Sequence, residues 1–444
     1  TSAVLPVFNT LVQKELSLGL SQPFHLLALL LITLICGLVA GSYPSLYLSS
    51  FNPVFVLKGI QLKTGSAALI RKGLVVVQFS ISIILIIGTI IIYQQIQHVK
   101  SRELGFNKNN LVEMNMQGDM VKHFSVIKNE LLNSGYIESL ALSDHTTIED
   151  GNNSDGFTWK GKPAGAKFLI SNRYVSPEFM STTGIKILEG RNLEQNDTLS
   201  KSGVNTVITA SLEKLMGTGS AVGKTLHYEG DTTVVTVVGV VNDYVYGNMY
   251  GKPDPVMFFC APPQNTSVMY VRISPQTNPE QALAKIGEVI KKVNPAYPFD
   301  YRFVDDQFNA MFLSEMLISK LSRVFAALAI IISCLGLFGL ASYTAERRTK
   351  EIGVRKILGA SVPGLAAMVS KDFLLLVGIS CIIAFPVAWW AMHNWLKGYA
   401  YRIEINWLIF LVAGCVALII ALATVSFQAI KAAIANPVKS LRTE

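Results

Sequence analysis

Residues 73–93 read GLVVVQFSISIILIIGTIIIY, an apolar run that contains no Lys, Arg, Asp or Glu. A helix needs about 20 such residues to cross the hydrocarbon core of a bilayer. Four further segments meet the same criterion, at 24–41, 324–340, 373–392 and 407–427. One buried core helix could imitate such a run, but five in one chain predict an α-helical membrane protein.

Charged residues are distributed unevenly between these runs. Only 15% of the 444 residues are charged, against about 25% in an average soluble domain. Residues 98–318 nevertheless have a soluble composition, with 20 Lys and Arg against 24 Asp and Glu. The net charge of +8 therefore belongs to the flanks, where it suits anionic lipid headgroups. Nucleic-acid binding would need a basic face on the soluble domain, so no nucleic-acid partner is predicted.

The short loops predict the orientation. Segments 42–72, 343–372 and 428–444 carry thirteen Lys and Arg, whereas segments 1–23 and 394–406 carry three. By the positive-inside rule the first group is cytoplasmic, which places 98–318 outside and the C-terminus inside. Five spans then put residue 1 outside without a signal peptide before it, as expected for the C-terminal part of a longer protein.

A short repeat favours the same expectation. Residues 51–58 read FNPVFVLK and residues 435–442 read ANPVKSLR, each following an apolar run at a similar distance. Matched placement of this kind indicates duplication of a membrane unit. The chain would then form a dimer of membrane halves, or a pseudo-dimer with a missing N-terminal half.

The pattern divides the chain into four regions. Residues 1–72 would hold the last helix of a preceding half and a cytoplasmic linker, and residues 73–97 a span with its stalk. Residues 98–318 would form the external domain, and residues 319–444 three spans with a cytoplasmic loop. Polar stretches at 94–104 and 305–323 lack Gly and Pro, so we expect them to extend the adjoining spans as stalk helices.

Short strands and helices alternate within the external domain. This alternation predicts an α/β or α+β fold, divided into two lobes near the polar stretch 144–155. Helices are expected at 120–133 and 279–293, and strands at 111–116, 168–174, 204–209, 225–228, 233–241, 268–273 and 300–304.

Sequence motifs for nucleotide binding, metal binding or catalysis match poorly or are absent. Residues 217–225 read GTGSAVGKT, but Thr218 occupies the first glycine position of a phosphate-binding loop, so a Gly-rich turn is predicted instead. The five Cys and six His lack metal-ligand spacing, and no Gly-x-Ser-x-Gly occurs. We therefore predict no catalytic residue, cofactor or metal site, and do not expect an enzyme.

The most informative polar stretch is 342–361, which reads SYTAERRTKEIGVRKILGAS. Arg347, Glu351 and Arg355 recur every four residues, so a helix would carry them on one face as possible ion pairs. Its last three residues could end this helix and begin another. The residues alone leave two interpretations open, a lipid-surface anchor or a docking helix for a cytoplasmic protein. A lipid anchor would not need Glu346 and Glu351.

This stretch resembles the Glu-Arg-x-x-Glu-Ile-Gly-x-Arg-Lys-x-x-Gly-Ala motif of the FtsX/MacB-type permeases of ABC transporters. It departs from that motif by one additional residue before Glu-Ile-Gly. Segments 71–73, 104–107, 183–186, 189–191 and 238–243 are similar to the MacB-like half of the family, so the resemblance spans nearly the whole chain. The matching motif positions are Glu346, Arg347, Glu351, Ile352, Gly353, Arg355, Lys356, Gly359 and Ala360.

The resemblance implies mechanotransmission. A separate cytoplasmic ATPase would bind ATP and move a coupling helix at 343–361, and the stalks would pass the movement to a MacB-like periplasmic core domain. Gly336 and Gly339 would permit close helix packing in the span before it. The implied ATPase-coupling residues are Glu346, Arg347, Lys350, Glu351, Gly353, Arg355 and Lys356.

The same resemblance leaves the physiological role open. Export of a peptide, lipid or drug-like molecule is the leading hypothesis, with a periplasmic adaptor or outer-membrane channel as further partners. The alternative is an FtsX-like regulator that activates a periplasmic partner such as a cell-wall hydrolase. A receptor without an ATPase is disfavoured by the coupling motif. The repeat matches the duplicated, eight-span form of the family found in Bacteroidetes.

Overall fold

The computed structural model describes residues 5–12, 15, 17, 22–49, 65–198 and 203–434. Contacts divide the chain into two compact units. One unit comprises Thr1–Gln94, Ser314–Trp395 and Glu404–Glu444, and is helical. The other comprises Gln95–Leu313 and Leu396–Ile403, and contains the sheet.

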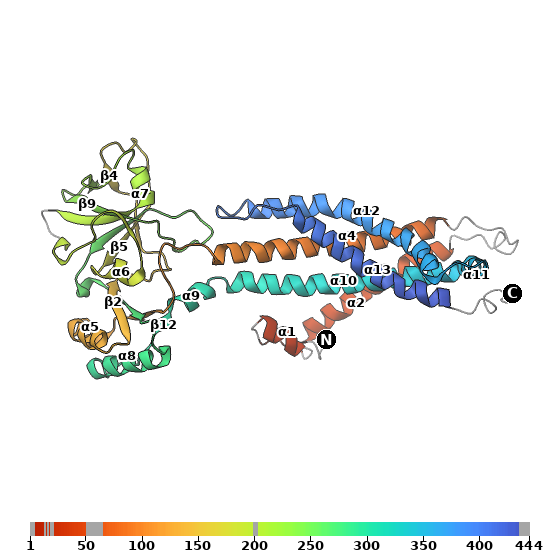
Figure 1. Cartoon of the computed structure of the whole chain (residues 1–444), viewed down its shortest axis with the longest axis horizontal. Helices are drawn as coiled ribbons and strands as arrows, with labels where there is room; N and C mark the ends of the chain where they lie inside the picture. Colours follow the sequence, from red (N-terminus) through yellow and green to blue (C-terminus); the bar gives the residue numbers. More distant parts are fainter. Residues whose placement is uncertain are drawn as a thin grey trace. The chain divides into compact units, whose positions relative to one another are not determined.

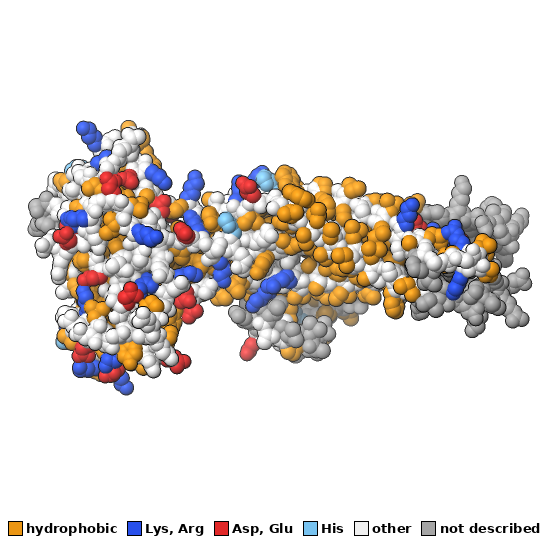
Figure 2. Space-filling view, in the orientation of Figure 1, with side chains coloured by type: hydrophobic (Ala, Val, Ile, Leu, Met, Phe, Trp, Pro, Cys, Tyr) orange, Lys and Arg blue, Asp and Glu red, His pale blue; other side chains and the backbone are white. Residues whose placement is uncertain are grey.

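Four long helices dominate the helical unit, and they lie side by side in Figure 1. Apolar side chains cover the visible face of this unit in Figure 2. Among the described residues, four helical segments have the length and hydropathy of membrane spans, which confirms four of the five predicted spans. These segments are Leu69–Lys100 in α4 (Gly65–Lys100), Leu313–Arg347 in α10 (Leu313–Arg347), Ser370–Leu396 in α12 (Val362–Leu396) and Leu408–Gln428 in α13 (Leu408–Ile434).

The fifth predicted span, 24–41, falls in α2 (Pro23–Ser49), which follows the short α1 (Leu5–Val12). The part of α2 with described side chains, Pro23–Leu38, is apolar but shorter than a span. This span therefore stays a prediction. Both copies of the repeat, at 51–58 and 435–442, lie outside the described residues, so the duplication stays a prediction as well.

Small hydroxyl side chains connect α4 to its neighbours. The hydroxyl oxygens of Ser82 on α4 and Ser333 on α10 are 3.0 Å apart. The Ser380 hydroxyl of α12 donates to the carbonyl of Val76 at 3.1 Å, and Ser80 donates to the carbonyl of Ser380 at 3.3 Å. Such contacts contribute about 0.6 kcal/mol each between membrane helices. They hold α4 against both α10 and α12.

The sheet of the second unit is mixed, and its described strands number twelve. Their order is β12-β1-β11-β2-β5-β10-β7-β9-β8-β4, with β3 paired to β5 and β6 paired to β9. The strands are β1 (Leu111–Asn115), β2 (Ile137–Ser143), β3 (Asn152–Ser154), β4 (Phe157–Trp159), β5 (Ile170–Val175), β6 (Ile187–Gly190), β7 (Val204–Thr209), β8 (Thr225–Tyr228), β9 (Val234–Val241), β10 (Val256–Cys260), β11 (Val268–Ile273) and β12 (Arg302–Phe303).

Two separate apolar cores confirm the predicted division into lobes. The first packs α5 (Phe124–Asn133) and α8 (Pro279–Val293) against β1, β2 and β11, and both helices lie near β2 in Figure 1. The second packs α7 (Ala210–Leu215) against β7, β9 and β10. The chain passes between the lobes through the polar stretch 144–155, as predicted. The remaining short helices of the domain are η1 (Gly118–Met120), α6 (Phe179–Thr183), η2 (Gln195–Asp197), η3 (Pro263–Asn265) and α9 (Val304–Ala310).

The Gly-rich segment 217–225 is a turn between α7 and β8, as predicted. Gly217, Gly219 and Gly223 all have positive φ. The Lys224 ammonium donates to the carbonyls of Thr218 and Gly219 at 3.4 and 3.5 Å. Lys224 therefore stabilises the turn to which it belongs.

The stalk predicted over 305–323 is not a continuous helix. Helix α9 ends at Ala310 and α10 begins at Leu313. Between them the amide of Phe312 donates to the carbonyl of Asn309, three residues back, at 3.2 Å. The Phe312 ring is buried and packs edge-to-face on Phe308, with centroids 5.1 Å apart. Burial of this ring in the domain accounts for the break.

Asp197 is a buried carboxylate whose protonation is coupled to folding. The Arg191 guanidinium donates to both of its oxygens, at 2.6 and 2.9 Å, and Asn205 donates at 2.5 Å. The hydrogen bonds from Arg191 are the largest cause of a pKa lowered to about 2. Only 5% of this side chain is exposed. The ion pair therefore fixes the segment between β6 and β7.

We expect Asp197→Asn to lower the free energy of unfolding at pH 7 by about 2 kcal/mol, the equivalent of the pKa shift. Because the folded-state pKa is depressed, this contribution is present above about pH 4 and is lost as the pH falls to about 2. The measurement is thermal unfolding of the full chain in detergent across this range.

A suitable control is Asp155→Asn, which removes an exposed pair with Lys167 and should cost less than about 0.5 kcal/mol. A stability difference between wild type and Asp197→Asn that stayed constant from pH 7 to pH 2 would contradict the assignment.

Candidate functional site

The predicted coupling stretch 343–361 forms parts of two helices, which corrects the expectation of one charged face. Helix α10 continues to Arg347, Arg348 leaves helical geometry with ψ of 9°, and α11 (Thr349–Ile357) follows. Arg347 therefore lies on a different helix from Glu351 and Arg355. At the bend, the Arg348 guanidinium is 2.9 Å from the Asp372 carboxylate of α12, so an ion pair fixes the change of direction.

Within α11 the expected pairing is present. The Arg355 guanidinium lies 3.0 Å from the Glu351 carboxylate, one helical turn away. Gly359 ends the helix with φ of +91°, a conformation that favours glycine. Its amide donates to the carbonyl of Lys356, and the amide of Ala360 donates to the carbonyl of Arg355. These two bonds form a Schellman cap, which confirms the predicted helix end.

The next helix begins directly after this cap. The Ser361 hydroxyl accepts from the amide of Gly364 at 3.4 Å, the geometry of an N-cap for α12. The segment Gly-Ala-Ser therefore ends one helix and starts another, as the sequence predicts.

The other predicted coupling residues are distributed over both helices. Glu346 lies on α10 with Arg347, whose guanidinium carbon is 5.7 Å from the Tyr343 ring centroid. Lys356 lies in the last turn of α11. The Lys350 side chain and the surroundings of Gly353 lie outside the described part of the structure. Which of these residues meet a partner stays a prediction.

The two glycines expected to permit helix packing differ. A Cβ at Gly336 would lie 2.4 Å from Oε1 of Gln78 on α4, so the end of this side chain would have to move to admit a larger residue. A Cβ at Gly339 would have no described atom within 4 Å. A role of the two glycines in helix packing stays a prediction.

Helix α11 also carries an exposed apolar stripe. Val354, Ile357 and Leu358 are 48%, 64% and 80% exposed, and their spacing of three and four residues places them on one face. The Glu351–Arg355 pair lies on the same short helix. An apolar stripe next to fixed charges is suited to a protein or lipid surface that covers it.

A second group of contacts, which sequence analysis missed, lies at the turn between α12 and α13. The buried amide of Gln95 on α4 donates to the carbonyl of Tyr401 and accepts from the amide of Ile403, both at 2.9 Å. The Tyr401 ring stacks on His98 with centroids 4.4 Å apart and planes 6° apart. The Arg102 guanidinium carbon lies 4.5 Å from the centroid of the same ring.

The same turn also contacts the loop that follows β9. The Tyr401 amide donates to the carbonyl of Tyr250 at 2.8 Å, and the rings of Tyr250 and Tyr399 lie 4.7 Å apart. Arg102 donates to the carbonyls of Met249 and Gly251, each at 2.8 Å. Tyr401 thus joins three segments: the end of α4, the α12–α13 turn and the loop around residue 250. We call this group the Tyr401 junction.

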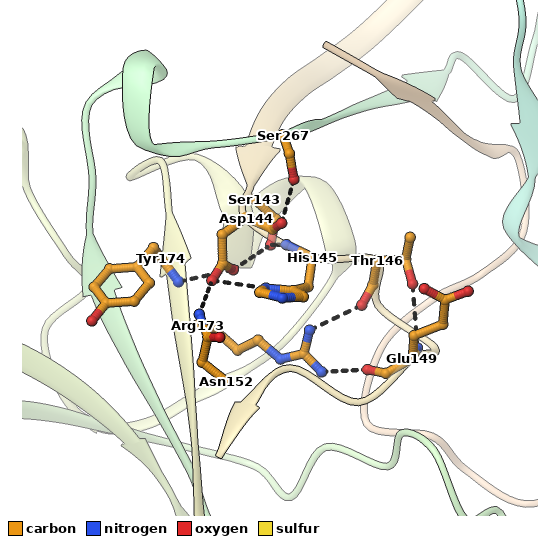
Figure 3. Close-up of polar contacts among 9 residues, drawn as sticks. All are labelled: Ser143, Asp144, His145, Thr146, Glu149, Asn152, Arg173, Tyr174 and Ser267. Atoms are coloured by element: carbon orange, nitrogen blue, oxygen red, sulfur yellow. Dashed lines mark hydrogen bonds and ion pairs between the residues drawn. The ribbon is translucent and has the colours of Figure 1, made fainter. Parts of the chain in front are cut away.

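A polar network stabilises the stretch between the lobes (Figure 3). The Arg173 side chain is 2% exposed and donates to the carbonyls of Thr146 and Glu149, at 3.1 and 2.5 Å. Asp144 accepts from the amide of Tyr174 at 3.1 Å and lies 2.9 Å from Nδ1 of His145. Arg173 therefore holds the connecting loop against β5.

A second buried chain links α9 to this network. Gln307 on α9 donates to the Glu113 carboxylate, and the Tyr270 hydroxyl donates to its other oxygen at 3.0 Å. The amide of Thr147 donates to the Tyr270 hydroxyl at 2.6 Å. Burial raises the pKa of Glu113, and the two side-chain hydrogen bonds oppose that rise. These bonds tie the start of the second stalk to the inter-lobe loop.

Comparisons with known proteins agree with this architecture. Residues 74–289 match the family of MacB-like periplasmic core domains, and residues 323–437 match the FtsX-like permease C-terminal family. These matches and the four long apolar helices identify the class as a multi-pass membrane permease with a periplasmic-type domain between its spans. The chain thus combines a MacB-like periplasmic core domain with an FtsX-like permease C-terminal domain, the arrangement of FtsX/MacB-family permeases.

The curated relatives match only part of this chain, and this chain matches only part of each relative. The macrolide export ATP-binding/permease protein MacB of Aggregatibacter actinomycetemcomitans is 22% identical over 56% of this chain and 40% of its own length. The protein of the same name from Neisseria gonorrhoeae is 23% identical over 47% of this chain and 33% of its length. The chain thus spans well under two thirds of these relatives.

Solved structures that resemble the chain are extracytoplasmic domains. The periplasmic region of MacB from Actinobacillus actinomycetemcomitans is 17% identical, with a TM-score of 0.32 over 47% of this chain and 94% of that one. The extracellular domain of the ABC-type transporter YknZ from Gram-positive bacteria is 15% identical, with a TM-score of 0.30 over 43% and 97%.

The Tyr401 junction makes a testable prediction about local stability. We expect Tyr401→Ala to speed amide exchange in residues 396–403 by about tenfold, because ring stacking and the cation–π contact are lost. Tyr401→Phe keeps the ring and should exchange like wild type. The measurement is hydrogen–deuterium exchange of the full chain in nanodiscs. Equal exchange in the Ala and Phe variants would contradict the junction.

Proposed function

We propose that this chain is the permease subunit of an ABC transporter of the mechanotransmission type. ATP would be bound and hydrolysed by a separate cytoplasmic ATPase subunit, and the chain would convert that movement into a change in its periplasmic domain. The chain would lie in a bacterial inner membrane with residues 98–318 periplasmic and its C-terminus cytoplasmic. The +12 balance of charge outside residues 98–318 supports this orientation.

The exposed stripe of α11 is the observation that carries the proposal. Three apolar side chains at Val354, Ile357 and Leu358 face away from the described parts of the bundle. A partner that covers these side chains would remove their apolar surface from water, which stabilises the complex by roughly 25 cal/mol for each Å² buried. The ion pair between Glu351 and Arg355 would give the same surface directional polar contacts, which an aqueous protein partner can satisfy better than lipid tails.

Connectivity supports a location for α11 at the opposite end of α12 from the turn Leu396–Ile403. Helix α12 begins shortly after α11 and ends at this turn, where α13 follows. Since α12 has the length of a span, α11 and the turn would lie on different sides of the membrane. A partner bound at α11 would therefore act on α10 and α12 directly.

The helices and the Tyr401 junction supply a route for this movement. Helix α10 runs without a break from the domain boundary at Leu313 to Arg347, next to α11. Helix α12 leads from the Ser361 cap to the turn that carries Tyr401. A shift of α11 would thus reach the domain through α10 and through the contacts of Tyr401 with Tyr250.

The proposed activity is export of a peptide, lipid or drug-like molecule. Its support is the similarity to proteins named for macrolide export. A periplasmic adaptor or outer-membrane channel would complete an exporter, and assembly would use a second permease half. The alternative is a regulator that activates a periplasmic protein.

Docking is tested with the double variant Ile357→Glu and Leu358→Glu, co-expressed with an ABC ATPase subunit from the same organism. We expect co-purification of the ATPase to fall at least about tenfold, because the stripe can no longer be buried. Since both residues are exposed, the fold should be retained. Val126→Glu, on the exposed face of α5, is the matched control and should co-purify normally.

Two results would contradict docking. Unchanged co-purification and ATP turnover in the double variant would show that α11 does not bind the motor. Normal ATPase binding, together with altered lipid contact of a spectroscopic probe attached to α11, would assign α11 to the lipid surface instead.

Export and regulation are separated by what stimulates ATP turnover in the reconstituted complex. We expect small lipophilic compounds or peptides to raise turnover at least twofold, as substrates of an exporter. Stimulation only by a periplasmic protein would favour the regulator.

A further inference from the structure

A cleft of about 490 Å³ lies in the domain where α4 gives way to β1. Its main wall is the segment 102–109, and the opposite side comes from the turn between α6 and β6 and from the end of β9. The polar and charged residues that line it include Arg102, Glu103, Asn107, Lys108, Lys186 and Asn242.

Positive charge is concentrated in this cleft. Three cations line it, Arg102, Lys108 and Lys186, against one acid, Glu103. No ion pair of these three residues is present within the described part of the chain. The surrounding segment 98–318 has more acidic than basic residues, so the concentration is local.

Arg102 and Lys108 also contact neutral groups at the edge of the cleft. Arg102 donates to two backbone carbonyls. The Lys108 ammonium lies 4.0 Å from the ring centroid of Phe308, and burial lowers its pKa while Asp305 opposes the shift. An anion within reach of these groups would gain charge-assisted hydrogen bonds.

The wall of the cleft is preformed. The Asn242 side chain donates to the carbonyl of Gly105 at 2.8 Å and accepts from the amide of Lys186 at 2.7 Å. Gly105 has φ of +82°, and a Cβ there would lie 1.8 Å from the carbonyl oxygen of Asp243. Arg272 donates to the carbonyls of Asn107 and Asn109, both at 2.7 Å. A fixed wall reduces the entropy lost when a ligand binds.

Exposed apolar residues adjoin the basic cleft. Lys186 is followed directly by Ile187 and Leu188 of β6, which are 41% and 59% exposed. Among the described strands, β6 pairs only with β9, so its other edge is unpaired. A basic cleft next to an apolar strand matches a ligand that has an anionic head and a hydrophobic chain.

We propose that this cleft binds an anionic amphiphile. A phosphate or carboxylate is held by Lys108, Lys186 and Arg102, and the attached hydrophobic chain lies along Ile187, which directly follows Lys186. The proposal concerns binding to the domain and does not depend on the ATPase or on export. It is therefore tested without nucleotide or partner.

The experiment uses the full chain in nanodiscs of phosphatidylcholine, with methyl groups of isoleucine labelled with carbon-13. The signal of Ile187 is identified by its loss in Ile187→Val, and it reports on the cleft rather than on uptake into the bilayer. The probes are dihexanoyl phosphatidylglycerol, which is anionic, dihexanoyl phosphatidylcholine, which is zwitterionic, and inorganic phosphate.

We expect the anionic lipid to shift the Ile187 signal with saturation, and to bind at least about tenfold more tightly than the other two probes. The double variant Lys108→Gln and Lys186→Gln should weaken this binding by at least about tenfold. Arg102 is left unchanged because it also supports the loop around residue 250. The matched control, Lys160→Gln with Lys291→Gln, removes the same charge at exposed positions elsewhere in the domain and should bind normally.

Three results would overturn the proposal. Equal shifts with both lipids would remove the anionic requirement, and saturation by inorganic phosphate at the concentration of the lipid would remove the amphiphile. Equal weakening in the control variant would reduce the effect to general charge attraction.

Discussion

Hydrocarbon offers no hydrogen-bond partner to a peptide group, so this chain can cross a bilayer only as helices that satisfy their own backbone. That constraint makes α4, α10, α12 and α13 long, because a helix satisfies most of its peptide groups within the segment. The polar and irregular parts of the chain are confined to the helix ends. The surfaces that contact partners are therefore expected at the ends of these helices.

The ends on the two sides are built differently. At the α10–α11 bend, polar contacts such as Arg348 with Asp372 fix the backbone, and the apolar stripe is left exposed. At the other side the turn after α12 is buried by stacking and hydrogen bonds around Tyr401. One end is suited to receive a partner and the other to pass on a displacement. Within the domain, Arg173 and Glu113 add buried polar contacts that join the stalk and the two lobes.

Much of the fold could be predicted because its signals are local. Helix α8 coincides with the predicted 279–293, since its apolar positions follow the helical period and the Asn278 side chain caps it by accepting from Glu280. Strand β10 was missed, although β11, which is also buried at every position, was predicted. The bend at Arg348 was missed because its ion pair partner, Asp372, lies on another helix. The Tyr401 junction could not be predicted, because Gln95 and Tyr401 are 306 residues apart and neither belongs to a motif.

We propose that a movement imposed at α11 reaches the Tyr401 junction through the long helices α10 and α12. The most direct test is hydrogen–deuterium exchange of residues 396–403 in the complex with its ATPase, compared between ATP-bound and ADP-bound states. We expect the exchange rates of the Tyr401 and Ile403 amides to differ between the two nucleotide states. This difference should vanish when Ile357 and Leu358 are replaced by Glu. Exchange that is identical in both nucleotide states would contradict it.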